Sequence, residues 1–392
     1  MPRNPNKIDY SGGLPEPFSA FQVIEDRRTG GNKRHHFGEV LFMVVVGLLC
    51  GMDSFAAIEQ FCNNERNLKW LRRWIKLPHG VPRAQTFSNI FQLIDPGQFQ
   101  ECLIAHVAEI CPELKSQIIA IDGKALRGSR EFKKAAAHAV SAWAVDAGLT
   151  LAQEFVSEKS NEITALPKLL ELLDLEGHTV TIDAMGSQTE IARQIVEDKK
   201  AGYVLPAKGN QGNTYKEVID FFDIALKQLN LAKAKGWSHH EESEKGHGRL
   251  TKRTVLACQN LETFDYEIRE RWKGLESVIL LETETTMLAS GKERRRERHY
   301  YLSSEKLSAE EFGQVIRSHW GIENPCHWVL DVTFREDHSQ IRKGHAAKNM
   351  GTARRIVLNL LKANENFKGS LPAKRREALM NESYREQLLS LA

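Results

Sequence analysis

Two aspartates stand at the ends of short apolar runs, in positions suited to a shared chemical site. Asp122 ends the run QIIAID (residues 117–122), and Asp183 ends the similar run HTVTID (residues 178–183). Each run has the length and composition of a buried β-strand. If the two strands are parallel neighbours, both carboxylates leave the sheet at the same edge. There they repel each other unless a cation neutralises them.

A third carboxylate, Glu323, occurs in an amphipathic segment covering residues 308–342. Ser308 and Glu311 have the spacing of a capping box, and apolar residues then recur at helical intervals. Glu323 lies beside Ile322 and near two tryptophans, where a carboxylate is costly unless something pairs with it. Three carboxylates favour Mg²⁺ or Mn²⁺, because these ions prefer oxygen ligands. Two such ions can activate an attacking oxygen and stabilise a leaving oxygen in phosphodiester transfer.

Each of these signals also has a simpler explanation. An Asp after a strand is often a turn or cap residue, and the pair Asp122-Gly123 is a common turn signal. Pro325 follows Glu323 by two residues and removes a helix hydrogen bond, so a kink there would tilt Glu323 away from the aspartates. The combination of the three carboxylates is more specific than any one of them.

The sequence around these residues predicts the elements that position them, which are the strands of a mixed sheet and the helices that cover it. Residues 138–145 and 149–156 form strand-like runs joined by a short polar and glycine connection, which predicts a hairpin after the first strand. Helices and strands then alternate over residues 163–174, 178–183, 189–199 and 202–207. Ser187 and Glu190 predict a capping box for the second of these helices. Antiparallel strands followed by alternating helices and strands are typical of a mixed α/β sheet.

The whole chain of 392 residues is long enough for two or three domains. We expect an N-terminal arm, a helical domain that either binds DNA or serves dimerisation, a domain in two pieces that carries the three carboxylates, an insertion between those pieces, and a basic C-terminal tail. Their boundaries are 1–36, 37–114, 115–211 with 308–364, 212–307, and 365–392. Within the insertion, the run HHEESEKGHG predicts a solvated charged loop over His239–His247, because its spacing matches no zinc pattern.

Composition indicates a cytoplasmic protein with an acidic polymer as partner. The six cysteines form no C-x-x-C pair, which favours reduced thiols. The longest apolar run, Val40–Met52, is too short to cross a membrane and predicts a buried helix. From Ile341 to the end there are eleven Lys and Arg and four Asp and Glu, so this part has a net charge of +7. The rest of the chain has a net charge of −4, which gives +3 in total. Such a basic end favours nucleic acid, although a solvated helical face is the alternative.

Other basic or reactive segments leave two explanations open. The run NLKWLRRWIKL (67–77) predicts an amphipathic helix whose basic side either faces solvent or lies on DNA phosphates. The run KERRRER (292–298) is either an exposed hairpin edge or a DNA contact. Cys326 and His327 suggest a nucleophile with its base, but adjacent helical residues point in different directions, which favours packing roles.

Long motifs in the chain resemble the H-repeat-associated family of bacterial insertion-sequence transposases. The matching runs include IDGKALRGS (121–129), TIDAMGSQTEIARQIVEDKKAGYVLPAKGNQ (181–211), HWGIEN (319–324), HWVLDVTFREDHSQIRKG (327–344) and NMGTARRIVLNLLK (349–362). The resemblance covers nearly the whole chain. It implies a DDE catalytic domain with a ribonuclease-H-like fold, so the expected fold class is α/β, with a β-containing insertion and an N-terminal helical domain.

The resemblance also implies roles for individual residues. Asp122, Asp183 and Glu323 would be the metal-binding catalytic carboxylates. DNA would be bound by residues at the strand ends and before the glutamate, namely Lys124, Arg127, Lys208, Asn210, Gln211, Arg317, His319 and Trp320. Two positions depart from a signature found in relatives outside this family: His319 stands where many have Arg, and Leu330 where they have Lys.

The leading hypothesis is therefore a DNA transposase associated with the nucleoid in the cytoplasm. It would bind the terminal inverted repeats of its element, cleave them with Mg²⁺ or Mn²⁺, and join the freed 3′-hydroxyl to target DNA. By resemblance, we expect a dimer on DNA, with no membrane contact. Two alternatives remain open at this point: a DNA-binding remnant that no longer catalyses, and a metal-dependent endonuclease that cleaves without joining.

Overall fold

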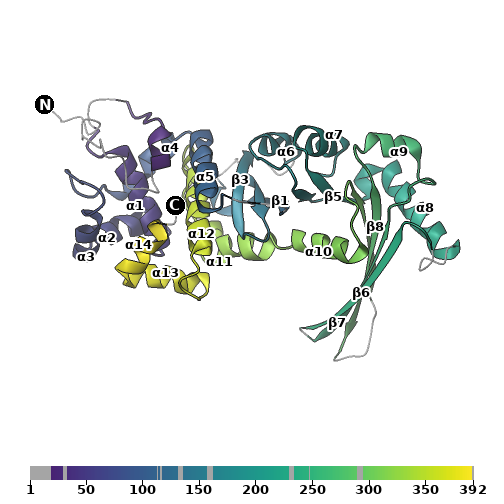
Figure 1. Ribbon diagram of the computed structural model, residues 1–392. Helices are drawn as coiled ribbons and strands as arrows, with labels where there is room; N and C mark the ends of the chain where they lie inside the picture. Colours follow the sequence, from purple (N-terminus) through teal and green to yellow (C-terminus); the bar gives the residue numbers. More distant parts are fainter. Residues whose placement is uncertain are drawn as a thin grey trace.

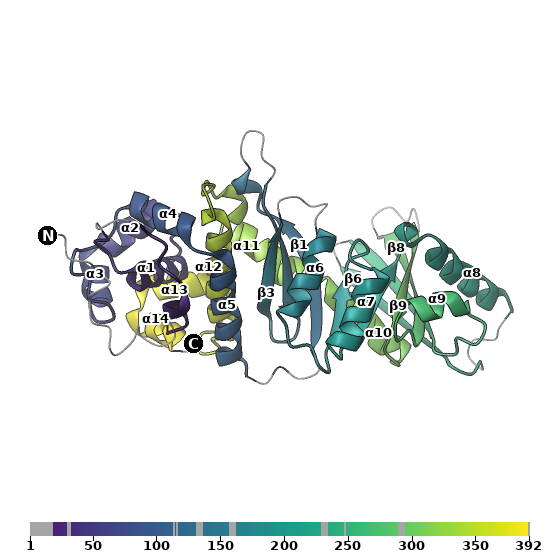
Figure 2. The same ribbon diagram turned by 90° about the horizontal axis from the view of Figure 1, so that it is seen from above.

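The chain folds into an elongated molecule with helices at one end, a sheet in the middle and a strand-rich arm at the other end (Figures 1 and 2). The computed structural model describes residues 19–29, 33–112, 114, 117–130, 136–156, 162–228, 234–246, 248–288 and 295–390. Residues 1–18 and 30–32 of the expected N-terminal arm and Lys292–Arg294 of the KERRRER run lie outside these ranges.

Nine strands form one mixed sheet in the order β3-β2-β1-β4-β5-β9-β8-β7-β6. The first five strands are β1 (Ile118–Ala125), β2 (His138–Ala144), β3 (Leu149–Val156), β4 (Thr179–Ile182) and β5 (Gly202–Ala207). β1 pairs antiparallel with β2 and parallel with β4, and β4 pairs parallel with β5. This order is the mixed sheet that the sequence pattern predicts, it agrees with the ribonuclease-H-like fold that the resemblance implies, and the predicted fold class is confirmed.

The strands of the region 212–307 continue the same sheet and then project from it as an arm (Figure 1). They are β6 (Trp237–Gly246), β7 (Arg249–Cys258), β8 (Ser277–Met287) and β9 (Arg295–Ser303), and β9 pairs antiparallel with β5. The prediction of a charged loop from His239 onward is wrong, because residues 237–246 pair with β7 over their whole length. Their charges suit an edge strand, where they discourage pairing with another chain.

Helices from both ends of the chain build the block on the other side of the sheet (Figures 1 and 2). They are α1 (Phe37–Leu49), α2 (Phe55–Asn63), α3 (Glu65–Leu71), α4 (Ala84–Leu93), α5 (Pro96–Ile110), α12 (Ala346–Ala363), α13 (Leu371–Met380) and α14 (Glu382–Leu389). Every residue of α1 is buried, as its apolar run predicts. In the part of the chain that the structure describes, no helix is both long and apolar enough to span a membrane.

Two sequence-based expectations about this block need correction. The helix predicted over 67–77 ends at Leu71, and Leu77 adopts a positive φ of 41°. Pro78 follows Leu77, and a residue before proline is disfavoured in the helical region. The basic end of the chain is not a wholly solvated surface, because Lys374, Arg375 and Arg385 are buried.

The buried charged residues of the C-terminal helices instead bind other parts of the helical block. Arg375 donates to the carbonyl oxygen of Leu48 at the end of α1, from Nε at 3.0 Å and from Nη2 at 2.9 Å. The same guanidinium pairs with Asp53 at 2.6 Å. On α12, the amide of Asn359 exchanges two 2.9 Å hydrogen bonds with the backbone of Thr150 on the edge strand β3. The helix therefore covers this edge and joins the block to the sheet.

Candidate functional site

The register of the sheet brings the two aspartates to neighbouring positions. β1 and β4 pair in parallel up to Ile121 and Ile182, and Asp122 and Asp183 are the next residues of each strand. The prediction that both carboxylates emerge at one edge is supported. One detail is wrong, since β1 does not end at Asp122 but continues to Ala125 by pairing with β2.

The pair Asp122-Gly123 is consequently part of a strand and not a turn. A Cβ on Gly123 would overlap Oε1 of Glu162 and lie 2.7 Å from Nε2 of His138. The buried side chains of His138 and Glu162 contact each other at this point. Glycine lets β1 pass close to that pair, and its backbone N–H donates to Asp122 Oδ1 at 2.8 Å.

Glu323 reaches the aspartates from a helix that carries the predicted capping box. Ser308 caps α10 (Ala309–His319), and both its hydrogen bonds with Glu311 are present. Beyond α10 the backbone widens into the π-helical turn η7 (Glu323–Trp328), where His327 N donates to Ile322 O at 3.0 Å. The wide turn accommodates Pro325, which has no N–H to donate. A kink at Pro325 therefore does not move Glu323 away from the aspartates, because Glu323 lines the same hollow as both of them.

This hollow, with a volume of about 490 Å³, brings carboxylates, cations and aromatic rings together. Asp183 Oδ1 accepts hydrogen bonds from Met185 N and Gly186 N, both at 3.1 Å. These contacts orient one oxygen of Asp183. Burial raises the pKa of Asp122 to about 6, and repulsion from Asp183 and Glu323 adds to the increase, while the Gly123 N–H lowers it. The hollow is thus a place where negative charge accumulates.

The donor set of the hollow fits a hard divalent cation. Among the described residues, no three His, Cys, Asp or Glu side chains already converge as a closed metal cage. Mg²⁺ does not require such a cage, because it is commonly held by one or two carboxylates together with water and substrate phosphate oxygens. Asp122, Asp183 and Glu323 supply oxygen ligands only, and their mutual repulsion is what a cation would relieve.

Five of the residues expected to bind DNA lie on or near open surface. Lys208, His319 and Trp320 line the hollow, and Trp320 is 60% exposed. Arg127 has an 80% exposed side chain that approaches Asp337 at 3.5 Å. Arg317 is exposed but pairs with Glu242 of β6 at 2.6 Å. Burial lowers the pKa of His319, whose Nδ1 lies 3.0 Å from Thr181 Oγ1.

Asn210 and Gln211, also expected to face DNA, hold the loop after Asp183 in place. Asn210 Nδ2 donates to Ala184 O at 2.8 Å, and Gln211 Nε2 donates to Ser187 O at 3.1 Å. The predicted capping box at Ser187 is wrong, because the buried Ser187 hydroxyl donates to Asp183 O at 3.0 Å and Gln188 is the N-cap of α7 (Thr189–Arg193). The loop that follows Asp183 is therefore held at both Ala184 and Ser187.

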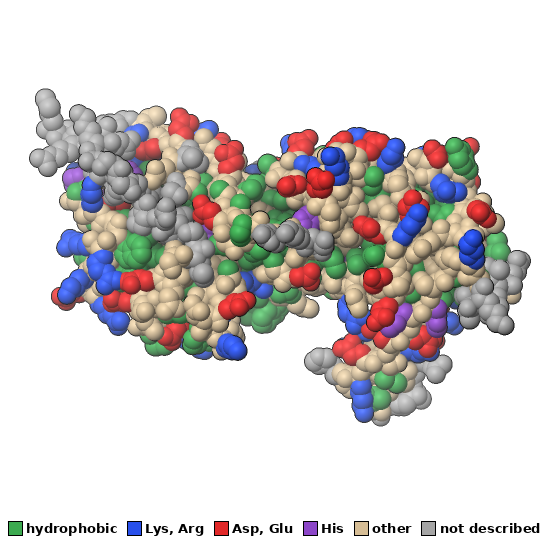
Figure 3. Space-filling view, viewed as in Figure 1, with side chains coloured by type: hydrophobic (Ala, Val, Ile, Leu, Met, Phe, Trp, Pro, Cys, Tyr) green, Lys and Arg blue, Asp and Glu red, His purple; other side chains and the backbone are tan. Residues whose placement is uncertain are grey.

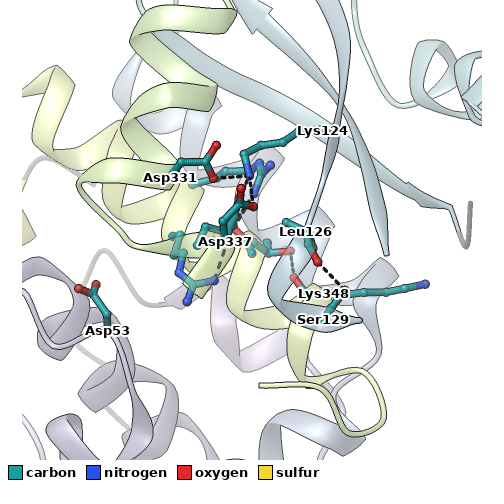
Figure 4. A network of polar contacts seen from close by, with 12 residues as sticks. Asp53, Lys124, Leu126, Ser129, Asp331, Asp337 and Lys348 are labelled. Atoms are coloured by element: carbon teal, nitrogen blue, oxygen red, sulfur yellow. Dashed lines mark hydrogen bonds and ion pairs between the residues drawn. The ribbon is translucent and has the colours of Figure 1, made fainter. Parts of the chain in front are cut away.

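Lys124 does not lie on an open surface, contrary to the expectation that it faces DNA. Only 7% of the residue is exposed, and its ammonium contacts Asp331, Glu336 and Asp337 at 2.7, 3.2 and 3.4 Å (Figure 4). The local sequence gave no sign of this, since the three acids lie more than two hundred residues further along the chain. Lys124 fixes β1 both to α11 (Val329–Val332), which contains Asp331, and to the segment after it.

His327 is a site residue that the sequence reasoning assigned to packing. Its Nδ1 lies 3.5 Å from Asp122 Oδ2, and its Nε2 is buried. Burial lowers the pKa of His327 to about 3, and the nearby Arg355 and Lys124 lower it further in the same direction. The one sequence signal that could have placed His327 in the site was its position four residues after Glu323. The π-helical turn brings the side chain of His327 next to Asp122.

Comparison with known proteins gives matches along most of the chain. Residues 113–360 match the family described as "Transposase DDE domain", and residues 18–107 match the family described as "DDE_Tnp_1-associated". The first of these matches contains Asp122, Asp183 and Glu323.

Curated relatives are similar over nearly their full length. "Putative transposase YncI" of Escherichia coli O157:H7 is 37% identical over 94% of this chain and 93% of its own. "H repeat-associated putative transposase YhhI" of Escherichia coli K12 is 34% identical over 94% and 96%. Among solved structures, a piggyBac transposase synaptic complex with hairpin DNA matches with a TM-score of 0.45 and 11% identity, covering 95% of this chain and 76% of that one.

Proposed function

The chain belongs to the transposase DDE domain family, and from this premise we propose that it is a DNA transposase that cleaves the ends of its element and joins them to target DNA. The observation that carries the proposal is the shared hollow of Asp122, Asp183 and Glu323. Two of these carboxylates come from adjacent strands of the sheet and the third from a helix encoded beyond the arm.

The three carboxylates would hold two Mg²⁺ or Mn²⁺ ions against the scissile phosphate. When bound, such ions activate the attacking oxygen and stabilise charge on the leaving oxygen. Residues of the chain supply the positioning. Asp183 is oriented by the Met185 and Gly186 N–H groups, and Asp122 by Gly123 N–H. Lys208 and the exposed Trp320 ring lie at the same hollow, where they would contact the phosphate backbone and a base of the DNA.

The test uses purified protein, Mg²⁺ and a supercoiled plasmid carrying the gene with its native flanking DNA. The wild type should nick the plasmid at the element ends and form strand-transfer products. Asp183→Asn and Glu323→Gln should each lower nicking by on the order of a thousandfold, because each removes a charged ligand for the ions. Asp146→Asn, which changes an exposed carboxylate in the β2–β3 turn, is the matched control and should cleave normally.

The outcomes separate the proposal from its alternatives. Nicking without joining would make the protein an endonuclease. DNA binding without any Mg²⁺-dependent nicking would make it a DNA-binding remnant. Normal cleavage by Asp183→Asn or Glu323→Gln would show that the hollow is not the active site.

A further inference from the structure

Asp122 lies at the point where β1 loses one of its two neighbouring strands. The pairing with β4 ends just before Asp122, at Ile121, but the pairing with β2 continues to Ala125. The hollow lies beside this strand end, because Asp122 and Asp183 both line it. A metal ligand in such a place needs support from other elements to keep its position.

The two faces of this strand end are supported by different groups. Successive side chains of a strand point to opposite faces, so Asp122 and Lys124 share one face and Gly123 lies on the other. On the first face, the Lys124 ammonium contacts the acids of α11 and of the segment after it. On the second face, His138 of β2 and Glu162 lie against Gly123. Glu162 is the first residue of α6 (Glu162–Glu171), which packs against β2 and β3 (Figure 2).

His138 and Glu162 are buried, unlike most ionisable side chains. Charged side chains are spread over the face of the molecule that Figure 3 shows. His138 and Glu162 are instead 4% and 7% exposed, and Nε2 of His138 contacts Oε1 of Glu162. Burying a carboxylate costs free energy that its surroundings must offset. A carboxylate buried next to a candidate metal ligand therefore calls for a functional explanation.

Contact with the backbone of Gly123 links these two side chains to Asp122. A Cβ on Gly123 would lie 2.7 Å from both Glu162 Cδ and His138 Nε2, so the two side chains fill the space that a larger residue would need. The backbone N–H of Gly123 donates to Asp122 Oδ1 at 2.8 Å. A shift of Gly123 would consequently move the group that orients the Asp122 carboxylate.

The electrostatic effects on Asp122 agree with this proximity. Burial raises the pKa of Asp122 to about 6, and nearby negative charges raise it further, against the lowering effect of the Gly123 N–H. Those charges belong to Asp183, Glu323 and Glu162. Glu162 is thus close to Asp122, although it comes from a helix on the opposite face of the strand.

We propose that Glu162 is a positioning residue of the hollow, which acts with His138 on Gly123 to hold Asp122 where it binds a cation. The inference rests on the proposed function for the role of Asp122 as a metal ligand. Among the described residues, the lining of the hollow includes Asp122 but neither His138 nor Glu162, so these two support the ligand from behind the strand. Replacing a residue that supports a metal ligand commonly changes metal affinity by about 10- to 100-fold.

The experiment measures Mn²⁺ binding to the full-length protein without DNA, by electron paramagnetic resonance of the free ion. Glu162→Ala removes the contacts with His138 and Gly123 and should raise the Mn²⁺ dissociation constant by about tenfold. Glu162→Gln keeps the size of the side chain and an oxygen next to His138, so its dissociation constant should stay within about threefold of the wild type. Plasmid nicking gives a second measurement. Glu162→Ala should need about ten times more Mg²⁺ for a half-maximal rate but approach the wild-type rate at saturation.

Two controls separate positioning from a loss of charge or of stability. Glu171→Ala removes the same kind of side chain from an exposed position of α6 and should bind Mn²⁺ normally. Thr352→Val removes a buried hydrogen bond between α12 and β3, in which the Thr352 hydroxyl accepts from Gln153 Nε2 at 2.7 Å. This variant should unfold at lower urea concentration, as Glu162→Ala should, but it should keep the wild-type affinity for Mn²⁺.

The outcomes distinguish this inference from the proposed function. If Glu162→Ala binds Mn²⁺ as tightly as the wild type while Asp183→Asn does not, the positioning role is wrong and the proposed function stands. Equal losses of affinity in Glu162→Ala and Glu162→Gln, or in Glu162→Ala and Thr352→Val, would also overturn it. A wild type that shows the expected differences in Mn²⁺ binding but never nicks DNA would overturn the proposed function and leave the positioning of Asp122 standing.

Discussion

Asp122 and Lys124 lie two residues apart on β1, but the structure surrounds their charges in opposite ways. The Asp122 carboxylate shares a hollow with two further carboxylates, and their repulsion helps to raise its pKa to about 6. The Lys124 ammonium meets three carboxylates, and two buried arginines, Arg354 and Arg355, balance the same cluster. Uncompensated charge of one sign indicates a place for a ligand, whereas compensated buried charge indicates a structural role.

The compensated cluster consists of Lys124, Asp331, Glu336, Asp337, Arg354 and Arg355. Removing its central acid should have the largest effect and is the strongest test of the difference between the two regions. Glu336 is 2% exposed and lies 3.2 Å from Lys124 and 3.4 Å from Arg355. Glu336→Gln leaves these cations with too little negative charge, so the free energy of unfolding should fall by about 3–5 kcal/mol. Urea unfolding in Mg²⁺-free buffer measures the loss.

The matched change in the hollow should behave differently. Asp183→Asn keeps an oxygen that accepts from Met185 and Gly186 N–H, and it removes repulsion between carboxylates. Its free energy of unfolding without Mg²⁺ should stay within about 0.5 kcal/mol of the wild type or rise. A loss as large as that of Glu336→Gln would mean that the two regions are not distinct.

The pH dependence of stability should also report the compensated cluster. Burial alone would raise the pKa of Glu336, but Arg355, Lys124 and Arg354 outweigh it and hold the pKa at about 2, below its ordinary value of 4.5. A depressed carboxyl pKa stabilises the folded state above pH 4.5, and this contribution is lost as the pH falls from 4.5 through about 2. The loss should be roughly 3 kcal/mol. In Glu336→Gln, the free energy of unfolding should change less with pH over this range than in the wild type. An unchanged pH dependence would contradict the placement of Glu336 in the compensated cluster.

A divalent cation should stabilise the hollow and leave the compensated cluster unaffected. At a Mg²⁺ concentration ten times its dissociation constant, the free energy of unfolding of the wild type should rise by about 1.4 kcal/mol. Asp183→Asn should lose most of this gain, because it removes one charged ligand. Asp146→Asn should keep it. Thermal unfolding with and without Mg²⁺ gives the answer, and an equal gain in wild type and Asp183→Asn would place the ion elsewhere.

The sequence predicted the parts of the site that depend on local pattern. The apolar runs before Asp122 and Asp183 specify short buried strands, and the capping box at Ser308 specifies the start of the helix that leads to Glu323. These features follow from backbone hydrogen bonding and hydrophobic periodicity over a few residues.

The parts that depend on distant partners could not be predicted. Lys124 looked like a DNA-facing cation because its acidic partners, such as Glu336, come from far along the chain. Asn210 and Gln211 looked like DNA contacts, but their amides bind carbonyl groups of the loop after Asp183. The strand at 237–246 looked like a loop because its charges concealed its pairing with β7.

His327 gives the finest test of the comparison, since it lies between the two regions. Its Nδ1 faces Asp122 at 3.5 Å, and the positive charges of Arg355 and Lys124 also lower the pKa of its ring. A separation of 3.5 Å is longer than a good hydrogen bond, so a shift of a few tenths of an ångström would let Nδ1–H donate to the carboxylate. Such a donor behind a metal-binding carboxylate commonly affects activity or metal affinity by about 10- to 100-fold.

His327→Ala should therefore lower Mg²⁺-dependent nicking by about tenfold and raise the Mg²⁺ concentration needed for half-maximal rate. His327→Asn offers an N–H donor close to the position of Nδ1 and should recover much of both. Both variants remove ring atoms from a mostly buried position, so both should unfold more easily than the wild type. If nicking followed stability alone, the two variants would be equally impaired, and His327 would belong to the compensated cluster. Recovery in His327→Asn without recovery of stability would instead assign the histidine to the hollow, as the residue that orients Asp122.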